Sequence, residues 1–375
     1  MDVKKLLCIT GTLDCGGAET FLMKIFRRLD RTKYIMDFCI TVPEKCYYDD
    51  EAELLGGKIY RIPQKSQSLS NFKKRLYNVV KGGNYRYVLR VTSTPLGFLD
   101  AKIAKKAGAE ICSVRSSNSS EGGGFREKIE AFVGRALYGK YIDVKIAPSD
   151  LAARHTFGER AYGNGDVNIL HNAIDPETYR FDPAARARLR KDFGIADTEI
   201  LIGHIGRFAK QKNHGFLIEV FAESLRRNPA CRLILIGSGV LENKIKEKAS
   251  ELGVLDRIIF TGVRSDIPDL LSAIDVFAFP SLFEGMPNTV IEAQATGLHC
   301  IISDTITREA DITGLVRYLP IDRDAIGVWV DSVLESKTAE RRSQKEAFIR
   351  NHYDIDSVVN DFTDLVFGEK TGNLT

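Results

Sequence analysis

The sequence lacks several features that would define its class at once. None of its seven cysteines forms a C-x-x-C pair, so the pattern favours buried free thiols in a reducing compartment over a disulfide framework or a zinc site. No apolar run approaches the roughly 20 residues that a membrane-spanning helix needs, and the N-terminal run is too short for a signal peptide. The first glycine-rich segment is not G-x-G-x-x-G, which gives little support to a nicotinamide cofactor. We therefore expect a cytoplasmic protein without such a cofactor.

Charge is distributed unevenly along the 375 residues. Residues 1–170 contain 28 basic and 19 acidic residues, whereas the rest contains 25 and 31. A basic half indicates an anionic partner such as nucleic acid or an anionic membrane surface, although a solvated surface without a partner would look the same. The aromatic pattern of a single-strand nucleic-acid binder is absent, so no nucleic acid is expected. The segment NFKKRLYNVVKGG, with Lys73, Lys74 and Arg75 beside Phe72 and Leu76, is a basic amphipathic stretch suited to an anionic membrane surface.

Apolar runs and helical patterns alternate twice along the chain. This alternation predicts an α/β protein with two Rossmann-like, doubly wound domains, at residues 1–172 and 186–351. The stretch VNILHNAIDPETYRFDP is interpreted as the connector, and the two domains are expected to meet near residues 171–186. The last stretch, within 353–375, has apolar residues at helical spacing. Ligands of such sheets bind beyond the carboxyl ends of the strands, so we expect a shared cleft and motifs placed just after strands.

Three segments after expected strands carry candidate chemistry. In GTLDCGGAET, Gly16 and Gly17 precede a helix whose N-terminus attracts an anion, although a tight turn without a ligand fits equally. In HIGRFAKQKNHG, Arg207 and Lys212 are two cations suited to a diphosphate leaving group, and Lys210 competes for that role.

The third segment is EGMPNTVIE, in which two carboxylates flank an expected helix start. Glu284 precedes the helix and Glu292 lies within it, and each carboxylate accepts hydrogen bonds from sugar or ribose hydroxyls. Pro287 suits the first helical turn, and the amides of residues 285–288 are expected to face a phosphate. A hydrolase with paired carboxylates is the alternative.

Together, these segments resemble the GT-B glycosyltransferases of family 4. The matching stretches are DCGGAE, GRFAKQK and EGMPNTVIE, supported by LHNAID, LILIGSG, IIFTGVRSDIPDLLSAIDVFAFPSLFEG and EAQATGLHCIISD. The segments GGAETFLMKIFRRLDRTKY and LGGKIYRIP further resemble the branch that builds bacterial exopolysaccharide and capsule. The resemblance runs over essentially the whole chain.

The resemblance implies a role for each matched residue. Arg207 and Lys212 would bind and stabilise the donor diphosphate, and Glu284 would bind the donor sugar. The C-terminal helix, about 353–375, would complete the first domain, which binds the acceptor. The remaining donor-side residues are Gly16 and Gly17 near the phosphates, Gly237, Gly239 and Val263 beside the base, Gly285, Met286, Pro287 and Asn288 near sugar and phosphate, and Glu292 at the ribose.

One segment departs from the family pattern. Relatives in this branch often show HSHN where this chain reads VRSSNSS, so Arg115, Ser117 and Asn118 stand where acceptor-side histidines would be expected. Arg115 is interpreted either as a reader of an anionic acceptor group or as a surface arginine. His155, His171 and His214 are poor substitutes by position and are expected to be structural.

The expected function is therefore transfer of a sugar from a nucleotide-sugar donor, with UDP as the commonest base of such donors. The resemblance implies retention of anomeric configuration and no metal, and we identify no Asp-x-Asp motif after an expected strand. The expected acceptor is a polyprenyl-diphosphate-linked sugar at the inner membrane face. The alternatives are a catalytically silent partner subunit, a nucleotide-sugar epimerase, or a phosphorylase, for which no pyridoxal lysine is marked.

Overall fold

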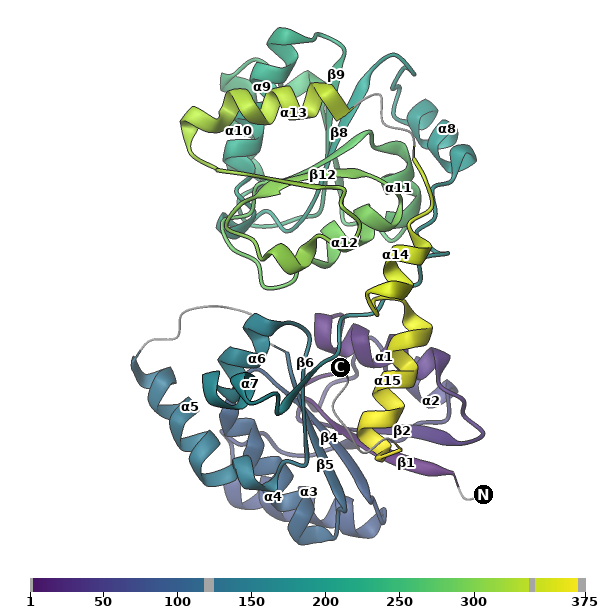
Figure 1. Ribbon diagram of the computed structural model, residues 1–375, viewed down its shortest axis with the longest axis vertical. Coiled ribbons are helices and arrows are strands. Elements are labelled where there is room, and N and C mark those ends of the chain that lie inside the picture. The colour runs from purple at the N-terminus through teal and green to yellow at the C-terminus, as the bar shows by residue number, and fades with distance from the viewer. Residues whose placement is uncertain (1–2, 118–124, 337–340, 370–375) are drawn as a thin grey trace. The chain divides into compact units, whose positions relative to one another are not determined.

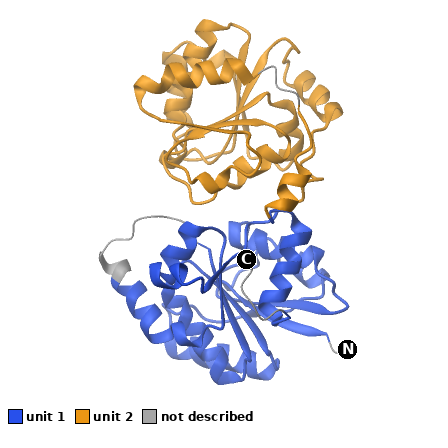
Figure 2. Ribbon diagram, viewed as in Figure 1, with its two compact units in different colours: residues 1–173, 352–375 blue, residues 174–351 orange. Residues whose placement is uncertain are grey.

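The chain folds into two compact units. The computed structural model describes residues 3–117, 125–336 and 341–369 (Figure 1). One unit comprises residues 1–173 and 352–375, and the other comprises residues 174–351 (Figure 2). We call them unit 1 and unit 2. Each contains a parallel sheet with helices on both faces, which confirms the predicted α/β, doubly wound class.

The sheet of unit 1 has seven parallel strands in the order β3-β2-β1-β4-β5-β6-β7. The chain runs outward from β1 to β3 and then returns past β1 to start the other half at β4, so the strand order reverses between β1 and β4. Open sheets of this kind bind ligands beyond the strand ends at such a reversal. The strands are β1 (Lys4–Ile9), β2 (Tyr34–Ile40), β3 (Ile59–Arg61), β4 (Tyr87–Thr92), β5 (Ile111–Ser116), β6 (Val144–Ala147) and β7 (Val167–Ile169).

Both faces of this sheet are buried under helices. Adjacent residues of β1, such as Leu6 and Leu7, belong to different core clusters because successive side chains of a strand point to opposite faces. One cluster joins β1 to α15, so segments from the two ends of the chain share a core. The helices are α1 (Gly17–Arg28) and α15 (Ile355–Phe367) on that face, α3 (Leu69–Gly82), α4 (Leu99–Ala107) and α6 (Asp150–Phe157) on the other, and α2 (Asp49–Leu54), α5 (Phe125–Tyr138) and α7 (Glu159–Gly163).

Unit 2 repeats this plan with six parallel strands in the order β10-β9-β8-β11-β12-β13. Its strand order reverses between β8 and β11. The strands are β8 (Ile200–Ile205), β9 (Cys231–Ile236), β10 (Ile258–Gly262), β11 (Val276–Phe279), β12 (His299–Ser303) and β13 (Val316–Leu319). The helices are α9 (His214–Arg227), α10 (Glu242–Glu251) and α13 (Ile326–Glu335) on one face, α8 (Pro183–Asp192), α11 (Ile267–Ala273) and α12 (Asn288–Ala295) on the other, and α14 (Lys345–Arg350).

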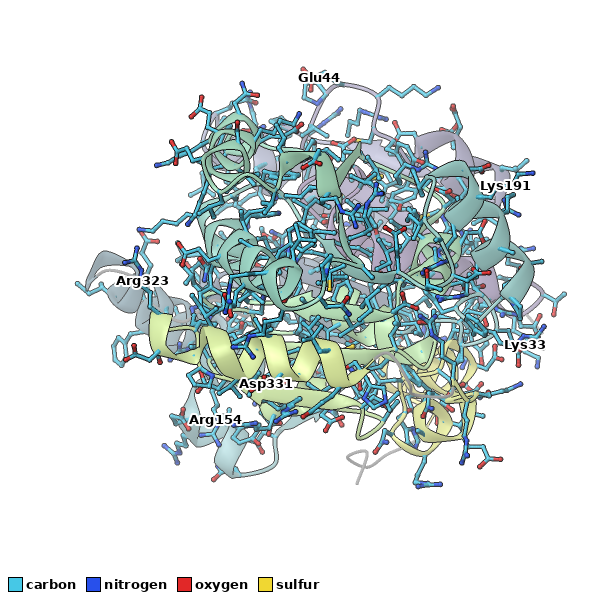
Figure 3. All side chains as sticks on the ribbon, turned by 90° about the horizontal axis from the view of Figure 1, so that it is seen from above. Lys33, Glu44, Arg154, Lys191, Arg323 and Asp331 are labelled. Carbon is cyan, nitrogen blue, oxygen red and sulfur yellow. The ribbon has the colours of Figure 1, made fainter. Side chains whose placement is uncertain are left out.

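Most charged side chains lie on the outside of both units, although a few, such as Asp100 and Arg190, are buried. Arg154, Lys191 and Asp331 are exposed and project from the ends or outer faces of their helices (Figure 3). The basic stretch at Lys73–Arg75 follows the same rule, because its cations are exposed on α3 while Phe72 and Leu76 are buried in the core of unit 1. Phe72 and Leu76 therefore belong to the core of unit 1, and the cations of this stretch face solvent.

The expected connector was assigned too broadly. Its first residues, Val167–Ile169, form β7 and pair with β6, and its last residue, Pro183, begins α8. A three-residue strand is too short to show the alternation that identifies strands in a sequence.

The shared core of the two chain ends predicts that α15 stabilises unit 1. Phe362 is fully buried, and its ring centroid lies 6.2 Å from that of Phe21. Phe362→Ala should lower the free energy of unfolding of unit 1 by about 3–5 kcal/mol, the usual loss for a buried phenylalanine. Urea unfolding measures this, with Phe132→Ala as the matched control because Phe132 is exposed on α5. Equal effects of the two substitutions would contradict the packing described.

Candidate active site

An ion pair joins two loops where the strand order of unit 2 reverses. Lys212 lies in the loop after β8, and Glu284 lies in the loop after β11. The Lys212 Nζ is 2.7 Å from Glu284 Oε1, and the side chains are only 17% and 11% exposed. Screening by water is weak at this burial, so the pair holds both side chains in fixed positions.

Three further contacts fix the same two loops to each other. The Leu282 amide donates to the Gln211 carbonyl at 2.8 Å, and Gln211 Nε2 donates to the Phe283 carbonyl at 3.0 Å. The Lys212 ammonium also lies 4.5 Å from the ring centroid of Phe279, at the end of β11. The cation and the carboxylate therefore stand at the carboxyl ends of β8 and β11, as the sequence motifs predicted.

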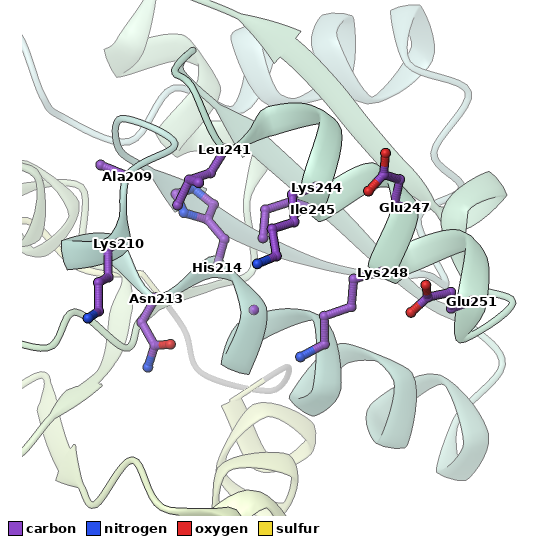
Figure 4. A pocket seen from close by; sticks show the side chains of 11 residues that line it. Ala209, Lys210, Asn213, His214, Leu241, Lys244, Ile245, Glu247, Lys248 and Glu251 are labelled. Carbon is purple, nitrogen blue, oxygen red and sulfur yellow. The ribbon is translucent and has the colours of Figure 1, made fainter.

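The structure separates Lys210 from Lys212. Lys210 is exposed and lines a pocket of about 580 Å³ between α9 and α10, together with Lys244 and Lys248 (Figure 4). Lys212 faces Glu284 instead. Of the two lysines that competed for the diphosphate, only Lys212 accompanies a candidate sugar-binding carboxylate.

Arg207 lies five residues before Lys212 on the same loop. Its side chain is exposed, and no carboxylate in the described ranges lies within ion-pair distance of it. A guanidinium in this state is available to an anionic ligand without first breaking an internal contact.

Gly237 and Gly239 bring the loop after β9 against the loop after β8. Gly237 has a φ of +138°, which favours glycine, and its amide donates to the Gly262 carbonyl at 2.9 Å. A Cβ on Gly239 would lie 2.6 Å from the Phe208 carbonyl oxygen, so a larger residue would displace the backbone next to Arg207. Both glycines thus have a packing role in addition to the predicted place beside a base. Val263, which follows Gly262, is 77% exposed and can contact a ligand.

The segment 285–288 differs from its prediction in one respect. α12 begins at Asn288, so Pro287 is the N-cap residue and does not lie in the first turn. Proline has no amide N–H, and the donors that this segment offers are therefore limited to the amides of Gly285, Met286 and Asn288. Glu292 lies further along α12, half-buried, and accepts a hydrogen bond from the Tyr179 hydroxyl. Burial, with the charge of Glu292, raises the pKa of Tyr179, so the phenol remains a donor.

Two buried histidines, His204 and His214, pack against the loop after β8. The His204 Nδ1 donates to the Ala278 carbonyl at 2.9 Å, and His214 stacks on Phe208 with ring centroids 4.3 Å apart. Burial lowers the pKa of both imidazoles, to about 4 for His214, and the charge of Lys212 contributes to each shift. Both rings are therefore neutral at pH 7 and serve as packing, which agrees with the structural role expected for His214.

Unit 1 has a polar pocket of about 460 Å³ where its own strand order reverses. Thr10 and Gly11 follow β1, Thr92 ends β4, and Ser93 and Thr94 follow β4. Ser117, predicted on the acceptor side, lines this pocket. Charged residues that the sequence analysis had not selected also line it: Glu19, Lys65 and Arg90. Gly16 caps α1 and Gly17 begins it, as expected, but the Glu19 carboxylate folds back over Gly16.

Arg115 is not a surface arginine and does not line this pocket. It is 1% exposed, its guanidinium lies 3.7 Å from the ring centroid of Phe21, and Nη2 donates to Asn172 Oδ1 at 2.8 Å. Burial lowers the pKa of Arg115 to about 9. Its contacts tie β5 to the segment after β7, so the geometry favours a structural role over recognition of an acceptor. Asn118, the third predicted acceptor-side residue, lies outside the described residues.

The remaining sequence predictions concern histidines and metals. His171 stacks on Tyr353 with centroids 3.9 Å apart, and burial lowers its pKa to about 4, while the His155 carbonyl accepts a hydrogen bond from Arg135. One Asp-x-Asp motif does follow a strand, because Asp322 and Asp324 lie in the loop after β13, a strand that the sequence pattern did not reveal. Asp322 caps a short helical turn there by accepting from the Ala325 amide. Within the described part of the chain no cluster of three metal-ligating side chains occurs.

Comparison with known proteins identifies the relatives of this chain. The family model described as glycosyl transferases group 1 matches residues 185–345, which cover most of unit 2. EpsF of Bacillus subtilis, named as a glycosyltransferase, is 34% identical over 92% of this chain and 91% of its own. A galactosyltransferase of Escherichia coli, UDP-Gal:α-D-GlcNAc-diphosphoundecaprenol α-1,3-galactosyltransferase, is 34% identical over 37% of this chain and 36% of its own.

Solved structures show the same fold. HepE of Anabaena, crystallised with UDP, superposes with a TM-score of 0.78 at 19% identity and covers 98% of this chain and 100% of its own. WaaG, a glycosyltransferase involved in lipopolysaccharide biosynthesis, gives a TM-score of 0.67 at 18% identity and covers 97% of this chain and 100% of its own. The fold of the chain is therefore the GT-B fold predicted from its motifs.

The low pKa of His214 predicts a specific loss of stability in acid. In the folded state His214 stays neutral down to about pH 4, whereas in the unfolded chain it takes up a proton near pH 6.5. Burial of the neutral His214 ring therefore contributes its full stabilisation above pH 6.5. As the pH falls toward 4 this contribution is lost, and the free energy of unfolding decreases by at most about 3 kcal/mol. His214→Phe should keep the stacking on Phe208 and lose less stability between pH 7 and pH 4 in urea titrations. Parallel pH profiles for the two proteins would contradict this.

Proposed function

Because the chain belongs to the glycosyl transferases group 1 family, we propose that it transfers a sugar from a nucleotide-sugar, and specifically from a UDP-sugar, to a lipid-linked saccharide. The chain is a glycosyltransferase on the evidence of its full-length relative. The observation that supports the donor side of this proposal is the Lys212–Glu284 pair at the ends of β8 and β11. It sets a cation suited to a phosphate beside a carboxylate suited to sugar hydroxyls.

In the proposed mechanism, Lys212 and Arg207 bind the donor diphosphate and stabilise its charge as the bond to the sugar breaks. Glu284, held by Lys212, accepts hydrogen bonds from the donor sugar and fixes its orientation. Two cations then serve the purpose that a metal ion serves in other transferases, so we propose that none is needed. Retention of anomeric configuration rests on the resemblance to family 4, in which a phosphate oxygen can act as the base.

The other donor contacts follow from this placement. The amides of Gly285, Met286 and Asn288 are proposed to contact the sugar and phosphate, and Glu292 the ribose hydroxyls. Gly237, Gly239 and Val263 are proposed to flank the base. Gly16 and Gly17, at the start of α1, are proposed to bind a phosphate of the donor through backbone amides. Support for UDP comes from HepE, which was crystallised with UDP and with UDP-glucose.

The acceptor is proposed to be a polyprenyl-diphosphate-linked sugar, in the synthesis of exopolysaccharide or capsule. Support comes from the E. coli relative, whose name specifies a sugar on diphosphoundecaprenol, and from a Vi polysaccharide biosynthesis protein of Salmonella typhi, 28% identical over 53% of this chain. Such an acceptor would be reached from the cytoplasm at the inner membrane face.

A donor screen tests the proposed function. The purified chain is incubated with UDP-, GDP-, dTDP- and ADP-sugars, and released nucleoside diphosphate is measured with and without EDTA. We expect release from one UDP-sugar that EDTA does not affect. Lys212→Ala should reduce it on the order of 10²-fold, as loss of a charge-stabilising donor does in other enzymes.

Lys210→Ala is the matched control, because this lysine is two residues from Lys212 and lines the pocket between α9 and α10 instead of pairing with Glu284. It should change the rate less than about twofold, as expected for a solvated charge. Equal effects of the two lysine variants would contradict the assignment of Lys212. If no donor binds and none is hydrolysed, the alternative of a catalytically silent partner subunit replaces the proposal.

Contact with the membrane is proposed to be electrostatic. Among the described residues no helix is long and apolar enough to cross a bilayer, and the apolar side of α3 is buried. The exposed cations Lys73, Lys74 and Arg75 remain available to anionic lipid, at about 1 kcal/mol each.

Vesicle sedimentation tests this contact. Replacing all three cations by glutamine should lower binding to vesicles that contain phosphatidylglycerol by about 100-fold at low salt. The wild-type protein should show little binding to neutral phosphatidylcholine vesicles. Unchanged binding of the triple variant would exclude α3 as the contact.

A further inference from the structure

Tyr179 lies in the segment that begins unit 2, before α8, and it reaches the carboxylate proposed to bind the ribose. Its hydroxyl donates a hydrogen bond to Glu292 on α12. The half-buried ring of Tyr179 packs against the apolar cluster that includes Val290 and Ala293. These two residues lie on either side of Glu292 in α12, so the packing of the ring holds the hydroxyl beside the carboxylate.

This hydrogen bond has a defined donor and a defined acceptor at pH 7. Burial, followed by the charge of Glu292, raises the pKa of Tyr179, so the phenol keeps its proton. A protonated phenol has one O–H to donate, and Tyr179 donates it to Glu292. A carboxylate offers about four acceptor positions on its two oxygens. One bond from Tyr179 therefore leaves acceptor positions for a ligand that donates.

The bond restricts a side chain that is otherwise flexible. Glu292 is half-buried, and the last torsion of a glutamate has a broad distribution, so holding its carboxylate in one orientation for a ligand costs conformational entropy. A hydrogen bond from Tyr179 fixes this orientation before the ligand arrives, which reduces that cost. The 2′- and 3′-hydroxyls of a ribose present two donors to such a carboxylate, whereas a 2′-deoxyribose presents one.

We propose that Tyr179 is a positioning residue that orients Glu292 toward the ribose and so makes the site selective for ribonucleotides over 2′-deoxyribonucleotides. The inference rests on the proposed function, because it assumes that Glu292 contacts the ribose of the donor. It extends that function to the class of donor, since UDP-, GDP- and ADP-sugars carry a ribose and dTDP-sugars do not. The competing interpretation is that Tyr179 only packs the segment before α8 against α12.

Calorimetric titrations of the full chain with UDP, 2′-deoxy-UDP and pyrophosphate separate these interpretations. In the wild-type chain we expect 2′-deoxy-UDP to bind about tenfold more weakly than UDP, as loss of a hydrogen bond to a charged group implies. Tyr179→Phe removes only the hydroxyl. It should weaken UDP binding by about tenfold, reduce the preference for UDP over 2′-deoxy-UDP to about threefold or less, and leave pyrophosphate binding unchanged.

Tyr318→Phe is the matched control. Tyr318 is also half-buried and packs against the same apolar cluster, but its hydroxyl donates to the Thr307 carbonyl at 3.0 Å. Its substitution should leave the affinities for both nucleotides unchanged. Thermal melting of the two variants verifies that both are folded.

A double-mutant cycle shows whether Tyr179 acts through Glu292. In a Glu292→Ala background, Tyr179→Phe should not weaken UDP binding further, because the carboxylate that Tyr179 orients is gone. A purely structural role would weaken UDP binding by the same factor in both backgrounds. With the UDP-sugar that the donor screen identifies, Tyr179→Phe should raise KM and leave kcat nearly unchanged, as expected for a contact that is equally strong in the ground state and the transition state.

Three results would overturn the inference: the wild-type chain binds 2′-deoxy-UDP as tightly as UDP, Tyr179→Phe leaves the preference for UDP at its wild-type value, or it weakens UDP binding equally with and without the Glu292 carboxylate. Its failure is distinguishable from that of the proposed function. If the inference alone fails, the wild-type chain still binds UDP and its turnover depends on Lys212. If the proposed function fails, the wild-type chain neither binds nor turns over a donor.

Discussion

The organisation of the candidate site depends on the ion pair between Lys212 and Glu284. It connects the loop after β8 to the loop after β11, the two strands between which the order of the second sheet reverses. Neither side chain is much exposed to solvent, so removing one of them leaves the other as a poorly compensated, largely buried charge. The neutral, buried rings of His204 and His214 lie beneath the same loop and add no competing charge at pH 7. The pair therefore presents a cation and a carboxylate in fixed relation before any ligand is bound.

Both units have a reversal of strand order in their sheet, but different side chains gather at it. In each, the strand order reverses beside the first strand of its sheet, and the polar groups gather beyond the ends of the two flanking strands. Unit 2 has Arg207, Lys212 and Glu284 there, whereas unit 1 has the pocket lined by Lys65, Arg90 and Glu19. Sequence motifs identify the first set, because its residues lie close together in the chain and immediately after strands. The second set is spread over 72 positions from Glu19 to Arg90 and shows no motif.

The sequence was sufficient to predict the fold and the placement of Arg207, Lys212 and Glu284 just after strands. Long apolar runs such as KKLLCIT and EILIGHI predicted β1 and β8, and the glycines and charges after them predicted the loops. Arg115 was expected at a ligand or at the surface and is inside unit 1, because one sequence does not reveal burial. The segment that forms β7 was interpreted as part of the connector, because three residues are too few for the alternation of a strand to be recognised. The choice between Lys210 and Lys212 also required the structure, because Lys210 lines the pocket between α9 and α10 whereas Lys212 pairs with Glu284.

The central claim is that Lys212 binds the diphosphate while Glu284 binds the donor sugar. It is tested most directly by calorimetric affinities for a nucleoside diphosphate and for the matching nucleotide-sugar, in the wild-type chain, Lys212→Ala and Glu284→Ala. The account predicts that Lys212→Ala weakens both ligands by about tenfold or more, as loss of a charged hydrogen bond does, and that Glu284→Ala weakens only the nucleotide-sugar. If Glu284→Ala leaves the preference for the nucleotide-sugar unchanged, or if Lys212→Ala leaves both affinities unchanged, the account is contradicted.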